Sequence, residues 1–147
     1  VSGSIKDRQS SGRLNLRVVS GEINAQSTAK EVVIENVSGD IQVSLGGIDE
    51  LIVSNVSGDF SGSLSLNESG AVKMSSVSGR LALKLQKNVQ ASFRLSANAG
   101  GDIINKITVQ KAKKAKYGPS SKLRFETGNA STNVRASTVS GDIIVSH

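Results

Sequence analysis

The chain has 147 residues, a formal net charge of +6 and only 3% aromatic side chains. It has no cysteine, and its single histidine is the last residue, His147. The lack of cysteine excludes a disulfide scaffold, a thiolate metal site and a thiol nucleophile. One terminal histidine argues against Ser-His-Asp catalysis and histidine-ligated metals. We therefore expect one domain over residues 1–147, with no enzyme activity, no metal and no cofactor.

A pentapeptide of the form Val-Ser-Gly-x-apolar recurs along the chain. The six intact copies begin at Val1, Val19, Val37, Val56, Val77 and Val139. Two degenerate copies, Ala99–Ile103 and Glu126–Ala130, fit between the last two intact ones. Successive motif glycines are 18 to 22 residues apart over the first five intervals, and then 27 and 13 residues apart. A period of this length is typical of repeat architectures.

Short segments of alternating polarity flank each motif. Apolar residues lie five and three positions before the valine, as at Val32 and Ile34, and alternation follows the glycine, as in 41–45 and 81–85. Alternation over four to six residues indicates half-buried strands, and no segment shows a helical stripe. Each repeat is therefore expected to contain two strands.

Strands that recur at a fixed period bury their apolar face by stacking on their neighbours. The sequence thus predicts an all-β fold, a parallel β-solenoid of about seven coils with an 18–22-residue repeat. Equivalent residues would lie about 4.8 Å apart in adjacent coils, and sequence position would map onto position along the axis. An antiparallel sandwich is the alternative, although it does not require the same pentapeptide in every repeat.

Each residue type in the motif has an expected role in the turn. We expect the valine to point inward, and the glycine to adopt a backbone angle closed to other residues or to let the next coil approach. Serine and aspartate would hydrogen-bond the backbone at the bend. The predicted structural turn ladder consists of Ser20, Gly21, Ser38, Gly39, Asp40, Ser57, Gly58, Asp59, Ser78, Gly79, Ser140, Gly141 and Asp142.

The aspartates of this ladder raise a catalytic alternative. Asp40 and Asp59 would lie about one strand spacing apart, which is the carboxylate separation of a retaining glycosidase. Asp102 takes the same place in a degenerate copy. A polysaccharide-active β-helix enzyme therefore stays open as an interpretation. Turn chemistry explains a position repeated in nearly every coil better, so we expect no catalytic residues.

The charge is unevenly divided between the two halves. Residues 1–73 carry 6 basic and 9 acidic side chains, whereas residues 74–147 carry 12 basic and 3 acidic ones. The richest stretch, which we expect to form a basic loop over residues 111–121, supplies candidate contacts for anionic lipid or cell-wall polymer. These candidates are Lys106, Lys111, Lys113, Lys114, Lys116 and Lys122.

Two interpretations of these lysines stay open. They bind a polyanion, or they only keep a strand edge soluble and unpaired. Nucleic acid is not expected as a partner, because Tyr117 is the only aromatic side chain there for base stacking.

Three segments of the repeat, residues 36–43, 55–60 and 137–145, resemble the toast-rack or adhesin-like domain family of bacterial cell-envelope proteins. The resemblance spans nearly the whole chain and implies a β-solenoid without catalysis. Members in low-GC Gram-positive bacteria occur in envelope stress responses, including proteins that sense membrane-active antimicrobial peptides and restrain a membrane-bound signalling system. Other members are described as adhesins.

The resemblance implies a domain of an envelope stress-response or signalling protein, peripheral or extracellular, that binds a partner protein, an antimicrobial peptide or an envelope component. An adhesin-like module for glycans or anionic cell-wall polymer is the alternative. The family offers no fixed binding residues, and a basic C-terminal half should repel cationic peptides. The chain starts inside a motif at Val1. We therefore expect a domain excised from a longer protein, with an end coil open to self-association.

Overall fold

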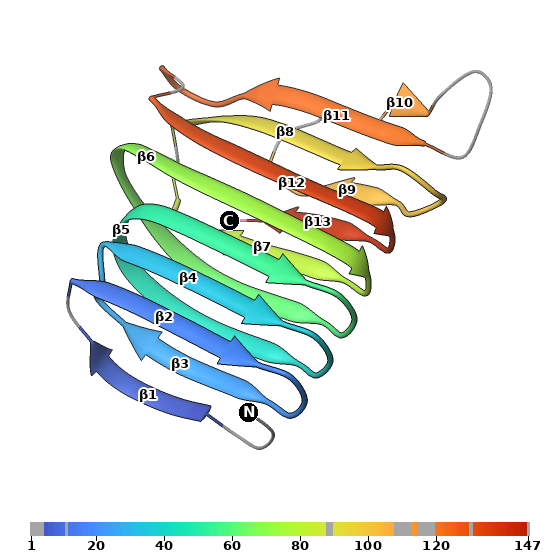
Figure 1. The fold of residues 1–147 in the computed structure, drawn as a ribbon. Helices are drawn as coiled ribbons and strands as arrows, with labels where there is room; N and C mark the ends of the chain where they lie inside the picture. The colour runs from blue at the N-terminus through green and yellow to red at the C-terminus, as the bar shows by residue number, and fades with distance from the viewer. Residues whose placement is uncertain are drawn as a thin grey trace.

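The computed structural model describes residues 5–10, 12–87, 90–107, 113–114, 120–129 and 131–146. Within these residues the fold is all-β, as predicted, with thirteen strands joined in one sheet. The sheet winds into a stack of rungs, so that it folds back over itself as two layers (Figure 1). We call these the front and back layers. The described part of the chain contains no helix long and apolar enough to cross a membrane.

Each layer takes one strand, or one part of a long strand, from each rung. The front layer contains, in spatial order, β2 (Arg13–Val18), β4 (Glu31–Asn36), the second parts of β5 (Ile41–Asn55) and β6 (Phe60–Ser78), β12 (Thr132–Ser140), β8 (Ala91–Ala97), β11 (Ser121–Glu126) and β10 (Lys113–Lys114). The back layer contains β1 (Ile5–Ser10), β3 (Ile23–Ser27), the first parts of β5 and β6, β7 (Leu81–Leu85), β13 (Ile143–Ser146) and β9 (Ile103–Asn105).

Most neighbouring strands are parallel, with equivalent residues of the repeat side by side. Leu14 pairs with Val32 in the front layer, and Ile23 pairs with Ile41 in the back layer. Two pairings, β11 with β8 and β10 with β11, are antiparallel. The sheet is therefore mixed, whereas the sequence predicts parallel neighbours throughout.

The order of strands in space departs from the order in the chain near the C-terminus. β12 lies between β6 and β8, and β13 lies between β7 and β9 (Figure 1). Since β11 occupies the outer edge of β8, only the inner edge is open to β12. The prediction that sequence position maps onto axial position is therefore wrong for this last rung, which is inserted into the stack. Even so, the strands formed by the described residues after Gly70 all lie toward one end of the stack.

The core lies between the two layers, because alternation turns the aliphatic side chains of both layers inward. One inner column consists of Leu14, Val32, Leu51, Val72, Val134, Phe93 and Phe125. The rings of Phe93 and Phe125 stack with centroids 4.5 Å apart. Phe60 fills the space beside Gly62, where an added Cβ would lie 2.7 Å from the ring. Each buried aliphatic side chain stabilises the fold by about 1.5–3 kcal/mol.

Candidate binding surface

The motif glycines form a column along one edge of the stack. Gly39 has φ 121°, and an added Cβ would lie 1.8 Å from the carbonyl oxygen of Gly21. Gly58 has the same relation to Gly39, at 2.0 Å. Only glycine fits, because a side chain disfavours positive φ and the next turn occupies the space. The column continues in spatial order through Gly79, Gly141 and Gly101.

The glycine of the second degenerate copy lies outside this column. A Cβ added to Gly128 would meet the side chain of Gln90 at 2.5 Å, and Thr127 N donates a hydrogen bond to the carbonyl oxygen of Ala91. These contacts place Gly128 at the start of β8, because β11 is antiparallel, whereas the motif turns lie at the opposite edge, past the ends of the parallel front strands. The prediction of a motif copy at Glu126–Ala130 is therefore wrong.

The motif serines link each turn to the turn beside it. Ser38 Oγ donates a hydrogen bond to the carbonyl oxygen of Val19 at 3.2 Å. The equivalent contact, to the motif valine of a neighbouring rung at 3.2 to 3.5 Å, is made by Ser57, Ser78 and Ser140. Ser20, half-buried, lies in the same turn as Gly21.

The motif aspartates accept hydrogen bonds from the backbone of the next turn. Asp40 Oδ1 accepts from Asp59 N at 3.2 Å, and Asp59 Oδ1 accepts from Arg80 N at 3.0 Å. Asp142 Oδ1 accepts from Asp102 N at 3.0 Å. Within the described residues, no group of three or more His, Cys, Asp or Glu could hold a metal ion. Asp40 and Asp59, two of the three carboxylates of the catalytic alternative, therefore act as turn acceptors.

The motif valine points outward, which contradicts the prediction that it points inward. Val19, Val37, Val56, Val77 and Val139 are between 46% and 52% exposed. Strand alternation turns the residue before each valine inward instead, and in two rungs that residue is a buried asparagine.

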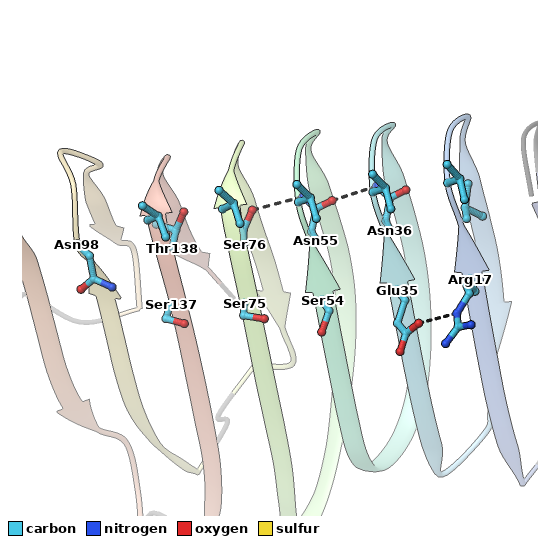
Figure 2. A pocket seen from close by; sticks show the side chains of 16 residues that line it. Arg17, Glu35, Asn36, Ser54, Asn55, Ser75, Ser76, Asn98, Ser137 and Thr138 are labelled. Atoms are coloured by element: carbon cyan, nitrogen blue, oxygen red, sulfur yellow. Dashed lines mark hydrogen bonds and ion pairs between the residues drawn. The ribbon is translucent and has the colours of Figure 1, made fainter.

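The side-chain amide nitrogens of the two buried asparagines donate to the turns that follow them, whereas Asn36 Oδ1 is buried without a hydrogen-bond partner among the described residues. Asn36 Nδ2 donates to the carbonyl oxygen of Gly39 at 2.9 Å and to Asn55 Oδ1 at 3.0 Å (Figure 2). Asn55 Nδ2 repeats the pattern with the carbonyl oxygen of Gly58 at 2.9 Å and Ser76 Oγ at 3.4 Å. This polar column ties the ends of successive front strands to their turns.

The exposed valines form one side of a groove of about 600 Å³ along the turn edge of the front layer. The second row of the groove lies two residues before each valine, and consists of Arg17, Glu35, Ser54, Ser75 and Ser137 (Figure 2). At the β2 end, Arg17 Nε and Glu35 Oε2 form an ion pair at 2.6 Å. The rest of this row is serine, so the groove is neutral over β5, β6 and β12.

A row of cations lies beside the serines, two residues further from the turns. It contains Lys73, Arg135, Arg94 and Arg124, whose Cα positions are paired from β6 through β12 and β8 to β11. All four residues are exposed. Because paired residues on one face of a sheet lie about 4.8 Å apart, they form a line of positive charge across four strands. We call this line the cation row.

The side chains on both sides of the cation row are short and uncharged over most of its length. These neighbours are Ser75, Ser137 and Ser96 on the turn side, and Ala71, Asn133 and Ser92 on the other. The exceptions lie at the β11 end, where Lys122 pairs with Ser96 and Glu126 pairs with Ser92. The ion pairs found among the described residues lie at the other end of the stack, in β2 and β4. None of them involves the cation row.

A family model described as Toastrack DUF4097 matches residues 2–146. The chain belongs to the Toastrack family. This membership confirms the predicted resemblance to toast-rack domains. Neither the curated proteins nor the solved structures include a match to the chain.

Some of the predicted lysines of this Toastrack chain adjoin the cation row. Lys122 is exposed on β11, where it continues the serine row beyond Ser96. Its Cα partner in β10 is Lys113, and Lys114 pairs with Ser121. Lys113 and Lys122 are therefore neighbours in the backbone register at the β11 edge of the front layer.

The other predicted lysines are not brought to this surface. Lys106 is exposed just after β9, in the back layer of the Toastrack fold. Lys111 and Lys116 lie outside the described residues.

Reasoning from the density of lysines missed the cation row, although part of it carries a signal in the sequence. Lys73 and Arg135 each lie six residues before a motif glycine, so aligning the repeats would place them in one row. Arg94 lies seven residues before Gly101. Arg124 has no such signal, because it belongs to the antiparallel strand β11.

Proposed function

We propose that this Toastrack domain is a non-enzymatic binding module of a bacterial cell-envelope stress-response or signalling protein. In this proposal it holds an anionic envelope component on the outer side of the front layer. The observation that carries the proposal is the cation row, in which Lys73, Arg135, Arg94 and Arg124 stand side by side without an ion-pair partner among the described residues. Uncompensated positive charge of this kind attracts anionic ligands.

The scaffold in this proposal is a parallel β-solenoid of about seven coils. Two observations support it: the one-repeat parallel registers from β1 to β7, and the single column of motif glycines. A stack of this kind keeps its outward side chains at a regular spacing. A preorganised surface loses less entropy when it binds than a flexible one, which favours affinity.

Co-sedimentation tests the proposed function. The domain is mixed with phosphatidylglycerol vesicles, with phosphatidylcholine vesicles, and with bacterial cell walls before and after removal of their anionic polymers. The test variant carries Lys73→Gln, Arg94→Gln and Arg135→Gln. The control carries Arg80→Gln, Lys84→Gln and Lys87→Gln, which remove the same charge from exposed residues outside the row.

We expect binding to anionic material that weakens as salt rises, is lost in the test variant and is kept in the control. If neither vesicles nor walls bind, or if both variants lose binding equally, the proposed function is wrong.

A second candidate, an adhesin-like module for neutral glycans, is favoured by the back layer. Its outer side carries two exposed rows of uncharged polar residues, Asn24, Gln42 and Ser61, and Gln26, Ser44 and Ser63. Amides and hydroxyls both donate and accept hydrogen bonds, as sugar hydroxyls require. Glycan binding that is insensitive to salt and is lost in Gln42→Ala would favour this candidate. Binding that disappears at high salt would count against it.

A further inference from the structure

We propose that the ligand of the cation row is a linear polymer with one phosphate group in each repeat unit, lying across the strands along the axis of the stack. This inference rests on the proposed function and names the class of anionic component that would bind. It follows from the shape of the row, from its side-chain chemistry and from the charges on the rest of the front layer.

The cation row is one side chain wide and four strands long. Three intervals of about 4.8 Å give it a length of about 14 Å along the stack. The short side chains on both flanks, such as Ser137 and Asn133 beside Arg135, leave the cations standing above their surroundings. A single polymer chain matches a line of charge of this width, because each phosphate along the chain can meet a cation in turn.

The side chains of the row suit phosphate in particular. Three of the four cations are arginines, whose planar guanidinium groups can donate two parallel hydrogen bonds to one phosphate. The hydroxyls of the adjoining serines, Ser75, Ser137 and Ser96, are further donors on the turn side.

The remainder of the front layer disfavours a flat anionic membrane as the ligand. On the same outer face, Glu31 and Glu35 of β4 are paired with Arg13 and Arg17, and Glu50 of β5 adds a further negative charge. A membrane pressed against the whole face would therefore meet no net positive charge at that end. In the row itself, Lys73 is followed by Ile52 in β5 and Val33 in β4, so the positive charge ends at β6. A polymer lying over β6, β12, β8 and β11 stays clear of these glutamates.

Calorimetry with phosphate compounds of increasing length tests the inference. The probes are inorganic phosphate, pyrophosphate, tripolyphosphate and long-chain polyphosphate, each titrated into the whole domain. We expect the affinity to rise with each added phosphate until the chain spans the four cations. For long-chain polyphosphate, the logarithm of the affinity should fall against the logarithm of salt concentration with a slope of roughly −3, as for four neutralised phosphates.

Two single variants test where polyphosphate binds on the domain. Arg94→Gln should weaken long-chain polyphosphate binding about tenfold and reduce the salt slope by about one. Lys84→Gln, which removes an exposed cation of the back layer, should change the affinity less than about twofold, because most of the attraction comes from charges near the ligand. Circular dichroism checks that both variants keep the strand content of the parent domain.

Two results would overturn the inference. One is that long-chain polyphosphate binds no more tightly, per phosphate group, than inorganic phosphate. The other is that Arg94→Gln and Lys84→Gln weaken polyphosphate binding equally. If phosphatidylglycerol vesicles bind while polyphosphate shows no dependence on length, the polymer inference fails and the proposed function stands. If vesicles, cell walls and polyphosphate all fail to bind, both the inference and the proposed function fail.

Discussion

The two ends of the front layer share one backbone plan and differ on their outer side. In β2 and β4, Arg13 lies 3.8 Å from Glu31, and Arg17 lies 2.6 Å from Glu35, so each cation faces an acid in the next strand. From β6 to β11, the cations face other cations across the ladder. The inner columns and the glycine turns continue through both ends. The inner residues therefore specify the fold, while the outer rows are free to carry function.

Stability alone gives no reason for the cation row. Exposed ion pairs like those of β2 and β4 contribute about 0–1 kcal/mol each, so their loss at the other end costs little. Like charges directly opposite each other in a sheet are mildly destabilising. The cation row weakens the fold slightly and adds nothing to the core. Its residues are therefore better explained by binding than by stability.

The largest change in stability is expected at the glycine turns, which both ends of the stack share. Gly39→Ala at one end and Gly141→Ala at the other should each lower the free energy of unfolding by more than about 3 kcal/mol, because the new Cβ meets a backbone carbonyl at positive φ. Urea denaturation measures the change. Gly46→Ala is the control, since nothing lies within 4 Å of its Cβ position. Tolerance of alanine at either end would show that the turn column is not shared.

Charge reversal should separate the two ends. Arg94→Glu is expected to weaken long-chain polyphosphate binding about 100-fold, because it replaces an attraction inside the row with a repulsion. Arg17→Glu makes the same change in net charge within the paired end, and should alter the affinity less than about threefold through the screened long-range field. Fluorescence anisotropy with labelled polyphosphate measures both. Equal losses would mean that net charge, rather than the row, determines binding.

The buried polar column gives a smaller contrast in stability. Asn55→Ala removes hydrogen bonds to Gly58 and Asn36, and should destabilise the fold by about 1–3 kcal/mol. Thr138 occupies the same column next to Ser76, and its Oγ1 is buried without a hydrogen-bond partner among the described residues. Thr138→Val should therefore be neutral or stabilise by up to about 1 kcal/mol. Thermal unfolding compares the two, and an equal loss in both would contradict this account of the column.

The smallest expected effect extends the cation row by one strand. Ile52 is the neighbour of Lys73 in β5, so Ile52→Lys adds a fifth cation in line. Long-chain polyphosphate should bind about three- to tenfold more tightly, and the salt slope should steepen by about one. Ser61→Lys adds the same charge to the back layer and serves as the control. Equal gains from the two variants would count against a linear site.

Part of this structure could be predicted from the repeated pentapeptide. It indicates an all-β fold, paired strands and a glycine turn column, because identical segments stack in register. The direction of the motif valine could not be read correctly from hydropathy. Val37 looks like a core residue and Asn36 like a surface one, yet Asn36 is buried, with its Nδ2 donating hydrogen bonds to the carbonyl oxygen of Gly39 and to Asn55 Oδ1.

The position of the last rung could not be predicted from the sequence, for a different reason. A strand with the common register can pair at either edge of its neighbour, so the chain does not reveal that β12 enters between β6 and β8. The cation row depends on this insertion, which sets Arg135 between Lys73 and Arg94. It depends as well on the antiparallel strand that carries Arg124.

The most direct test of the central claim is the backbone amide NMR spectrum of the domain titrated with long-chain polyphosphate. We expect shift changes concentrated at residues 71–76, 133–138, 92–97 and 121–126, with β2, β4 and the back layer unchanged. Changes centred on β2 and β4, or spread evenly over both layers, would contradict the claim that the cation row is the binding surface.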